Sequence, residues 1–259
     1  MATKSSGASL VDEDKQTITT PCTKCPIRTL GTFREFTPEE LAFVQKFKVG
    51  ELMVKAGSHV FLEGHDSAHL FSVLHGWVLR YKVLESGRRQ VLNFAVRGDF
   101  LGLQSVIFDK MLHSAQALSD VRLCVFSRER VWELYERHAG LAFDMTWIAS
   151  REESMIADHL VAVGQQPALQ RIAYILLCIF DRARRAGMLQ GRRLNIPITQ
   201  EHIADTMGLS VVHTNKSIRT LRERGLIDWR RNTLTLLDDV KLAELASFTS
   251  TEQRVRPFI

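Results

Sequence analysis

The sequence lacks any apolar run approaching the length of about 18 residues that is needed to span a bilayer. Its first 20 residues are polar and lack the apolar core of a signal peptide. We therefore expect a cytoplasmic protein with no membrane partner.

Cysteine is also scarce, since the 259 residues include only four: Cys22, Cys25, Cys124 and Cys178. Disulfides are rare in a reducing compartment, so metal binding, redox chemistry or burial has to explain these thiols.

Signs of enzyme chemistry are missing as well. We find no nucleophile with a base and an orienting group, no phosphate-binding glycine loop and no metal-binding histidine pair, so we expect that the protein is not an enzyme. The composition, 45% hydrophobic and 24% charged, is that of an ordinary globular protein, long enough for two modest domains. Residues 192–231 contain eight Lys/Arg against four Asp/Glu. This excess suits a polyanion such as nucleic acid, although a solvated basic face gives the same pattern.

Short strands are predicted between residues 49 and 126, where glycines separate β-rich runs at spacings of about ten residues. Residues 77–84 alternate so as to give one apolar face, and residues 85–90 form the hairpin turn that follows. A short helix precedes the strands, with Thr37 as its N-cap and Pro38 at its first position. This part of the chain is therefore predicted to be an antiparallel sandwich or barrel.

A long helical stretch is predicted after residue 127, about 35 residues in length with a break near Gly140. In its second half, apolar residues recur at steps of three and four and form a seam. A long helix with such a seam needs a partner, and a second copy of the chain is the simplest one. The alternative is packing against its own β-domain. The predicted dimer-interface residues are Met145, Ile148, Met155, Ile156 and Val163.

Residues 199–225 contain two short predicted helices about a glycine turn, which is the spacing of a helix-turn-helix. Thr199 is placed to cap the first helix, Gly208 turns the chain, and Ser210 is placed to cap the second. Residues 226–236 follow as a predicted β-hairpin wing. The candidate DNA-binding residues are the two caps together with side chains of the second helix and the wing: Thr199, Ser210, Val212, His213, Asn215, Lys216, Arg219 and Arg230.

These side chains have the chemistry that DNA recognition uses. Lys216 or Arg219 is suited to donate to guanine O6 and N7, and Val212 to pack on a thymine methyl group. His213 or Asn215 is suited to contact bases or phosphate, and the arginines of the wing to contact backbone phosphates. The alternative is a winged helix that serves a protein contact.

The order of β-roll, long helix and winged helix-turn-helix resembles the CRP/FNR superfamily of bacterial transcription regulators, and is nearest to its FNR-like, oxygen- or redox-responsive branch. The match covers residues 22 to 237 and rests on GDFLG at 98–102, SAQAL at 114–118 and VHTNK at 212–216. The resemblance implies a homodimer on a two-fold-symmetric DNA operator, a roll that responds to a signal, and RNA polymerase as a further partner. Many relatives have glutamate at the position of Val212, so the family's usual half-site is not expected here.

The resemblance also allows the residues that bind two kinds of signal in the family to be compared with those of this chain. The nucleotide-binding branch places a glutamate directly after the glycine that matches Gly102, and Arg-Ser further on, to hold ribose and phosphate. This chain has Leu103 and His113-Ser114 at those places. The missing carboxylate and guanidinium are the groups that would fix the nucleotide, so a cyclic nucleotide is not expected.

The oxygen-sensing branch holds a 4Fe–4S cluster on three N-terminal cysteines and one in the roll. Cys22 and Cys25 match the first two, Cys124 matches the roll cysteine, and the third N-terminal position is Gly31. A cubane needs four ligands, so this set is one short. Three interpretations stay open for these thiols: an intact or altered iron–sulfur site, a redox thiol pair or zinc site, and structural cysteines. Cys178 lies in an apolar helix face and is predicted to be a small buried hydrophobe.

The predicted fold is α+β, with an N-terminal antiparallel β-roll like that of cyclic-nucleotide-binding domains, a long dimerisation helix and a C-terminal winged helix-turn-helix. The predicted function is sequence-specific DNA-binding regulation of transcription by a homodimer that senses oxygen, redox state or another non-nucleotide signal. The alternative is a sensory module that signals through a protein partner without binding DNA. The predicted boundaries are a flexible tail at 1–20, the roll with its Cys pair at 21–137, the dimerisation helix at 138–164, the DNA-binding domain at 165–245 and a tail at 246–259.

Overall fold

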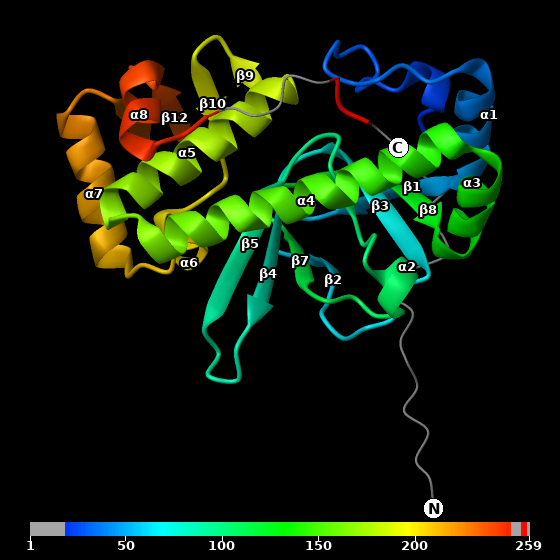
Figure 1. Cartoon of the computed structure of the whole chain (residues 1–259), viewed down its shortest axis with the longest axis horizontal. Coiled ribbons are helices and arrows are strands. Elements are labelled where there is room, and N and C mark those ends of the chain that lie inside the picture. The colour runs from blue at the N-terminus through cyan, green and yellow to red at the C-terminus, as the bar shows by residue number, and fades with distance from the viewer. Residues whose placement is uncertain (1–18, 250–254, 258–259) are drawn as a thin grey trace, which may run out of the picture.

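The computed structural model describes residues 19–249 and 255–257. The predicted tail at 1–20 therefore lies outside the described residues, except for Thr19 and Thr20. Helix α4 (Ala139–Gln165) crosses the molecule from its β-rich half to its C-terminal half (Figure 1). No helix among the described residues is long and apolar enough to cross a membrane.

The β-rich half consists of two four-stranded antiparallel sheets, which confirms the predicted roll. One sheet has the order β1-β8-β3-β6 and the other β2-β7-β4-β5. The single apolar face predicted for residues 77–84 is incomplete, because Val78, Leu79, Arg80 and Tyr81 are all buried, on both faces of β4. The strands are β1 (Lys48–Val54), β2 (His59–Phe61), β3 (His69–His75), β4 (Val78–Val83), β5 (Arg89–Ala95), β6 (Phe100–Leu101), β7 (Ser114–Ala117) and β8 (Val121–Ser127).

Helix α1 (Pro38–Phe47) begins with the predicted cap. The Glu40 amide donates to Thr37 Oγ1 over 3.2 Å, and the Thr37 amide donates to the Glu40 carboxylate over 2.8 Å. Helix α2 (Ser105–Phe108) lies between β6 and β7, and α3 (Val131–Arg137) follows β8. The break before α4 falls at His138. A side chain at Gly140 would place its Cβ 2.6 Å from the Glu40 carboxylate, so this glycine allows α4 to start directly against α1.

The inner face of α4 packs on its own roll. Met145 is fully buried and Ile148 is 8% exposed, in a cluster with Phe126 and Leu134. Of the predicted dimer-interface residues, Met145 and Ile148 thus pack mainly on the protein's own roll in the single chain. At this end of the helix, the seam at steps of three and four is the contact with the protein's own β-domain, which was the alternative interpretation.

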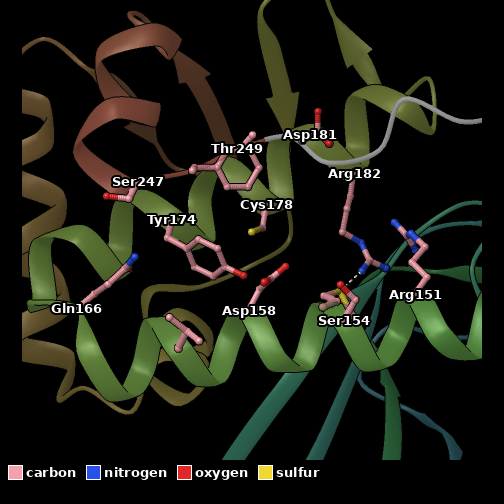
Figure 2. A pocket seen from close by; sticks show the side chains of 13 residues that line it. Arg151, Ser154, Asp158, Gln166, Tyr174, Cys178, Asp181, Arg182, Ser247 and Thr249 are labelled. Carbon is pink, nitrogen blue, oxygen red and sulfur yellow. Dashed lines mark hydrogen bonds between the residues drawn. The ribbon is translucent and has the colours of Figure 1, made fainter.

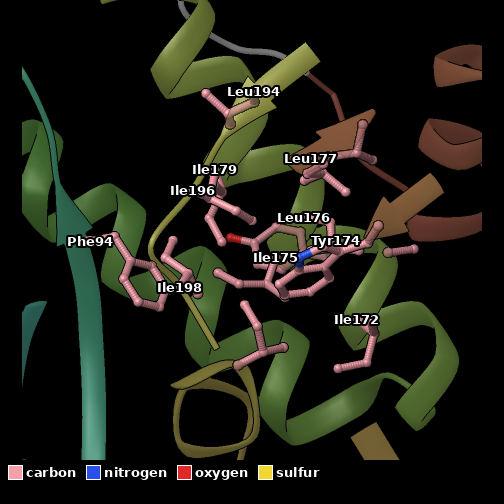
Figure 3. Close-up of a cluster of buried hydrophobic side chains, with 14 of the residues drawn as sticks. Phe94, Ile172, Tyr174, Ile175, Leu176, Leu177, Ile179, Leu194, Ile196 and Ile198 are labelled. Carbon is pink, nitrogen blue, oxygen red and sulfur yellow. The ribbon is translucent and has the colours of Figure 1, made fainter. Parts of the chain in front are cut away.

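The C-terminal half has the predicted winged helix-turn-helix, with a sheet of order β11-β12-β10-β9. Apolar side chains of α5 pack against Ile196 and Ile198, and Phe94 of the roll joins the same cluster (Figure 3). One hydrophobic cluster thus spans both halves, and we call it the shared core. The elements are α5 (Ala168–Arg185), β9 (Leu189–Gln190), β10 (Arg193–Asn195), α6 (Gln200–Met207), α7 (Val211–Glu223), β11 (Ile227–Arg230), β12 (Thr233–Leu236) and α8 (Asp239–Ala246).

Of the tail predicted for residues 246–259, the structure describes residues 246–249 and 255–257. Arg256 is 5% exposed, its amide donates to the Thr32 carbonyl over 2.9 Å, and its carbonyl accepts from the Arg34 amide over 2.7 Å. Its guanidinium donates to the buried Asp99 over 2.5 Å. An ion pair and two backbone hydrogen bonds thus hold Arg256 of the predicted tail against the N-terminal half.

Candidate DNA-binding surface and thiol cluster

The two helices of the helix-turn-helix are held by the predicted caps. Thr199 Oγ1 accepts from the His202 amide over 3.2 Å, and Ser210 Oγ accepts from the His213 amide over 3.2 Å. Gly208 ends α6 with φ +64°, a left-handed conformation that glycine adopts without strain. Thr199 and Ser210 therefore set where the two helices begin.

Helix α7 separates a buried face from an exposed one. Thr214, Ile218 and Leu221 are buried against the rest of the C-terminal half. The exposed side chains include five of the predicted DNA-binding residues, which we call the reading face: Val212, His213, Asn215, Lys216 and Arg219. The structure thus places all five on the solvent side of one helix.

Two arginines of this surface, Arg219 and Arg230, make only exposed ion pairs. Arg219 Nε lies 2.7 Å from Glu223 Oε1, and the two side chains are 80% and 60% exposed. In the wing, Arg230 Nε lies 3.0 Å from Asp228 Oδ1, also at the surface. Exposed ion pairs contribute little to stability, so both guanidiniums are available to exchange an acidic neighbour for a phosphate or a base edge.

The outer face of α4 carries apolar side chains that sequence reasoning missed. Phe143, Leu160 and Val161 are 67%, 70% and 59% exposed, and Ile156, which was predicted, is 41% exposed. We call these four residues the outer face of α4. Of the other predicted interface residues, Met155 accepts a hydrogen bond from Arg182 and Val163 packs against the shared core, so both have contacts within the chain. The sequence feature that could have identified them is a second apolar stripe of the helix, which lies beside the seam that faces the roll.

The roll contains a buried polar network around His113, which stands where the nucleotide-binding branch is expected to have its arginine. Arg80 Nε donates to His113 Nε2 over 3.0 Å, and its guanidinium pairs with Glu152 of α4. Asn93 Nδ2 also donates to the Glu152 carboxylate, over 3.1 Å. Burial, followed by the positive charge of Arg80, lowers the pKa of His113 to about 3, so the ring is neutral and accepts from Arg80. A nucleotide phosphate does not fit here, because the protein's own carboxylate already engages Arg80.

Three of the four cysteines come together. Cys22, Cys25 and Cys124 are 8%, 8% and 5% exposed and line one small cavity, which we call the thiol cluster. Lys48 also lines it and pairs with Glu51 over 2.7 Å, both side chains being buried. Burial raises the pKa of Cys22, and raises that of Cys124 to about 12. Both thiols are therefore protonated at neutral pH.

This thiol cluster does not fit a four-thiolate iron–sulfur centre. Its cavity of about 20 Å³ has room for roughly one water molecule. Gly31 brings no ligand, and no group of three or more His, Cys, Asp or Glu in the described part of the chain has an arrangement that could hold a metal ion. Protonated thiols would also have to lose their protons before they could bind a metal.

The segment that carries Cys22 and Cys25 continues to the DNA-binding half. Thr32 Oγ1 donates to the Arg185 carbonyl at the end of α5 over 2.8 Å. Leu30 lies so close to Gly187 that a Cβ there would come within 2.8 Å of it. This segment is therefore in direct contact with the end of α5 and the residue that follows it.

Comparison with known proteins agrees with this architecture. Residues 51–138 match the cyclic nucleotide-binding domain, and residues 170–245 match the Crp-like helix-turn-helix domain. The nitrogen fixation regulation protein FixK of Rhizobium meliloti (strain 1021) is 30% identical over 176 residues, which cover 68% of this chain and 77% of that protein. FixK of Bradyrhizobium diazoefficiens (strain USDA 110) is 28% identical over 87% of this chain and 94% of that protein.

The fold is also that of a solved structure, FixK2 from Bradyrhizobium japonicum. The two superpose with a TM-score of 0.70 at 21% identity, over 77% of this chain and 98% of that one. The match to the Crp-like helix-turn-helix domain and the similarity to these regulators argue against the predicted alternative, a module that does not bind DNA. The chain belongs to the CRP/FNR family of DNA-binding transcription regulators and is not an enzyme.

Proposed function

We propose that the chain acts as a homodimer that places helix α7 of each copy in the major groove of a two-fold-symmetric DNA operator. The observation that carries this is the reading face, five exposed side chains on one helix with its buried face anchored in the core. Lys216 and Arg219 donate to guanine, Val212 packs on a thymine methyl group, and His213 and Asn215 contact bases or phosphate. Arg230 contacts phosphate from the wing.

The outer face of α4 is the proposed dimer contact. Phe143, Ile156 and Leu160 expose apolar surface along a helix of 27 residues. A second copy of the same helix would cover this stripe in an antiparallel or parallel pair, as symmetric dimers do. RNA polymerase is the further partner we propose, in line with related proteins named as transcriptional activators, such as FnrL of Cereibacter sphaeroides.

The proposed signal is oxygen or redox state rather than a nucleotide. The support is the thiol cluster together with the contacts of its segment with α5. Two of the thiols would lose two electrons and two protons to a hydroperoxide, which becomes an alcohol and water, and would join in a disulfide. Because the thiols are buried and protonated, this reaction requires the segment to open first.

Selection of DNA fragments from a random pool, followed by footprinting, tests the DNA-binding proposal. We expect two half-sites with centres about 10 base pairs apart and binding that weakens steeply with salt. A footprint of a single half-site, or retention of DNA that salt does not affect, would contradict it.

Anaerobic purification with an absorption spectrum and an iron and zinc assay tests the proposed signal. Metal-free protein whose DNA binding responds to hydroperoxide supports the thiol mechanism, and metal-bound protein would overturn it.

A further inference from the structure

A second cavity lies between α4 and α5 and is not lined by any residue of the reading face. Its volume is about 320 Å³, within the size range of small-molecule sites. Figure 2 shows Arg151 and Arg182 at one end, and Tyr174 and Cys178 further along. Met155 and Phe248 also line it, so the cavity combines a cationic end with an apolar body.

The cationic end has an unusual charge arrangement. One buried carboxylate, Asp99, lies 2.6 Å from Arg182, 2.5 Å from Arg256 and 3.9 Å from Arg151. Arg182 is 9% exposed, and its Nε donates to no acceptor among the described residues. Four guanidiniums, those of Arg80, Arg151, Arg182 and Arg256, share two carboxylates here, Asp99 and Glu152. The excess of positive charge favours an anionic hydrogen-bond acceptor in the adjoining cavity.

Acidic residues limit what this acceptor is. Asp158 lies on the α4 side of the cavity, and Asp181 on the α5 side. Asp181 is engaged by Arg184 and, over 2.7 Å, by Arg185, whereas Asp158 is exposed. A ligand with a second negative charge near Asp158 would be repelled, so one anionic head with an uncharged body suits the cavity.

We propose that the cavity binds a small organic anion, with a carboxylate or phosphate head at Arg151 and Arg182 and an apolar body against Met155, Tyr174 and Phe248. Guanidiniums bind both kinds of head through paired hydrogen bonds. The cationic end of the cavity joins separate parts of the molecule, since Arg151 belongs to α4 and Arg182 to α5, and both lie next to Asp99 of the roll. Such a ligand is an effector of the regulator that acts independently of the thiol cluster.

Fluorine NMR on the full chain tests the proposal with two probes of the stated class, 4-fluorobenzoate and 4-fluorophenyl phosphate. At least one is expected to bind saturably, and the one that binds distinguishes the two heads. The uncharged 4-fluorobenzamide is expected to bind about tenfold or more weakly than that probe, since it lacks the charge that the guanidiniums recognise. Equal binding of 4-fluorobenzamide, or no saturable binding of either anion, would overturn the proposal.

Filling the cavity locates the site. Cys178→Phe occupies the apolar body without touching the contacts of Asp99, and should weaken binding of the probe at least about tenfold while DNA binding persists. Cys178→Ser keeps the space and is the matched control. If circular dichroism reports that Cys178→Phe is unfolded, Ser154→Trp at the exposed α4 side of the cavity replaces it. A folded, blocked variant that binds the probe as the original chain does would overturn the assignment, whatever the fate of the DNA-binding proposal.

Discussion

The reading face and the interior of the roll use charge in opposite ways. Arg219 and Glu223 pair at the surface with 80% and 60% of their side chains exposed, whereas Arg80 and Glu152 pair with 8% and 19% exposed. An exposed pair is separated at little cost and leaves its arginine free for DNA. A buried pair that loses one partner leaves an uncompensated charge. The difference indicates that the output surface is built to exchange partners and the interior to hold its parts in place.

The largest expected effect is at Asp99. Burial opposes its ionisation, but Arg182, Arg256 and Arg151 lower the pKa of this carboxyl well below its usual range. Asp99→Asn removes the charge that these guanidiniums share and should reduce the free energy of unfolding by about 3 to 5 kcal/mol. Urea unfolding at fixed protein concentration measures it. Asp228→Asn, whose pairs with Arg222 and Arg230 lie at the surface, is the control and should change little. Equal losses in both variants would remove the distinction between interior and surface.

The next effect is on assembly. Leu160→Glu puts a charge on the outer face of α4, where the side chain is 70% exposed in the single chain. If this face is the dimer contact, the charge has to be buried, and operator affinity should fall about 100-fold as the dimer dissociates. Sedimentation and mobility shift measure the two effects. Val240→Glu, at a site 66% exposed on α8, is the matched control. A Leu160→Glu variant that remains a dimer would show that the dimer contact is not on the outer face of α4.

A smaller effect is expected on the reading face itself. Lys216→Ala and Arg219→Ala should each weaken operator binding about tenfold and relax the base preference at one position, while the unfolding midpoint stays the same. Lys241→Ala removes a lysine that is 72% exposed on α8 and should leave binding unchanged. Footprints on operators with single substitutions identify the position that each residue reads. Normal affinity and preference in both reading-face variants would exclude the proposed contacts.

Local patterns were enough to predict the output half. The caps Thr199 and Ser210, the turn at Gly208 and the wing all follow from residues within a few positions of one another, and all are confirmed. The same holds for the cap of α1 at Thr37. Short-range hydrogen bonds and backbone preferences decide these features, so sequence spacing carries them.

The interior was harder to predict because its partners are far apart in the chain. Arg80 meets Glu152 across 72 residues, and Arg256 meets Asp99 across 157. Nothing in the sequence spacing marks these pairs. The same limit applies to Met145 and Ile148, which pack on the roll in the single chain. An apolar seam shows that a helix packs against something, but it does not show whether the partner is the same chain or a second copy.

The smallest effect also tests the interior, through pH. The pKa of His113 is lowered to about 3 by burial and by Arg80, and that of His159 to about 4 by burial and by Arg182. Below about pH 6.5 the unfolded chain binds protons that these rings do not accept in the folded state. Their contribution to stability is therefore present above pH 6.5 and is lost as pH falls towards 4.

Each histidine contributes a slope of up to about 1.4 kcal/mol per pH unit in that window. Urea unfolding at pH 6.5, 5.5 and 4.5 should therefore show a shallower fall for His113→Gln than for the original chain, because glutamine does not titrate. His65→Gln, at an exposed histidine, should keep the full slope. The comparison separates the buried network from general acid effects, which both variants share. A His113→Gln variant with an unchanged slope would mean that the ring takes up a proton in the folded state, and Arg80 would then depend on Glu152 alone.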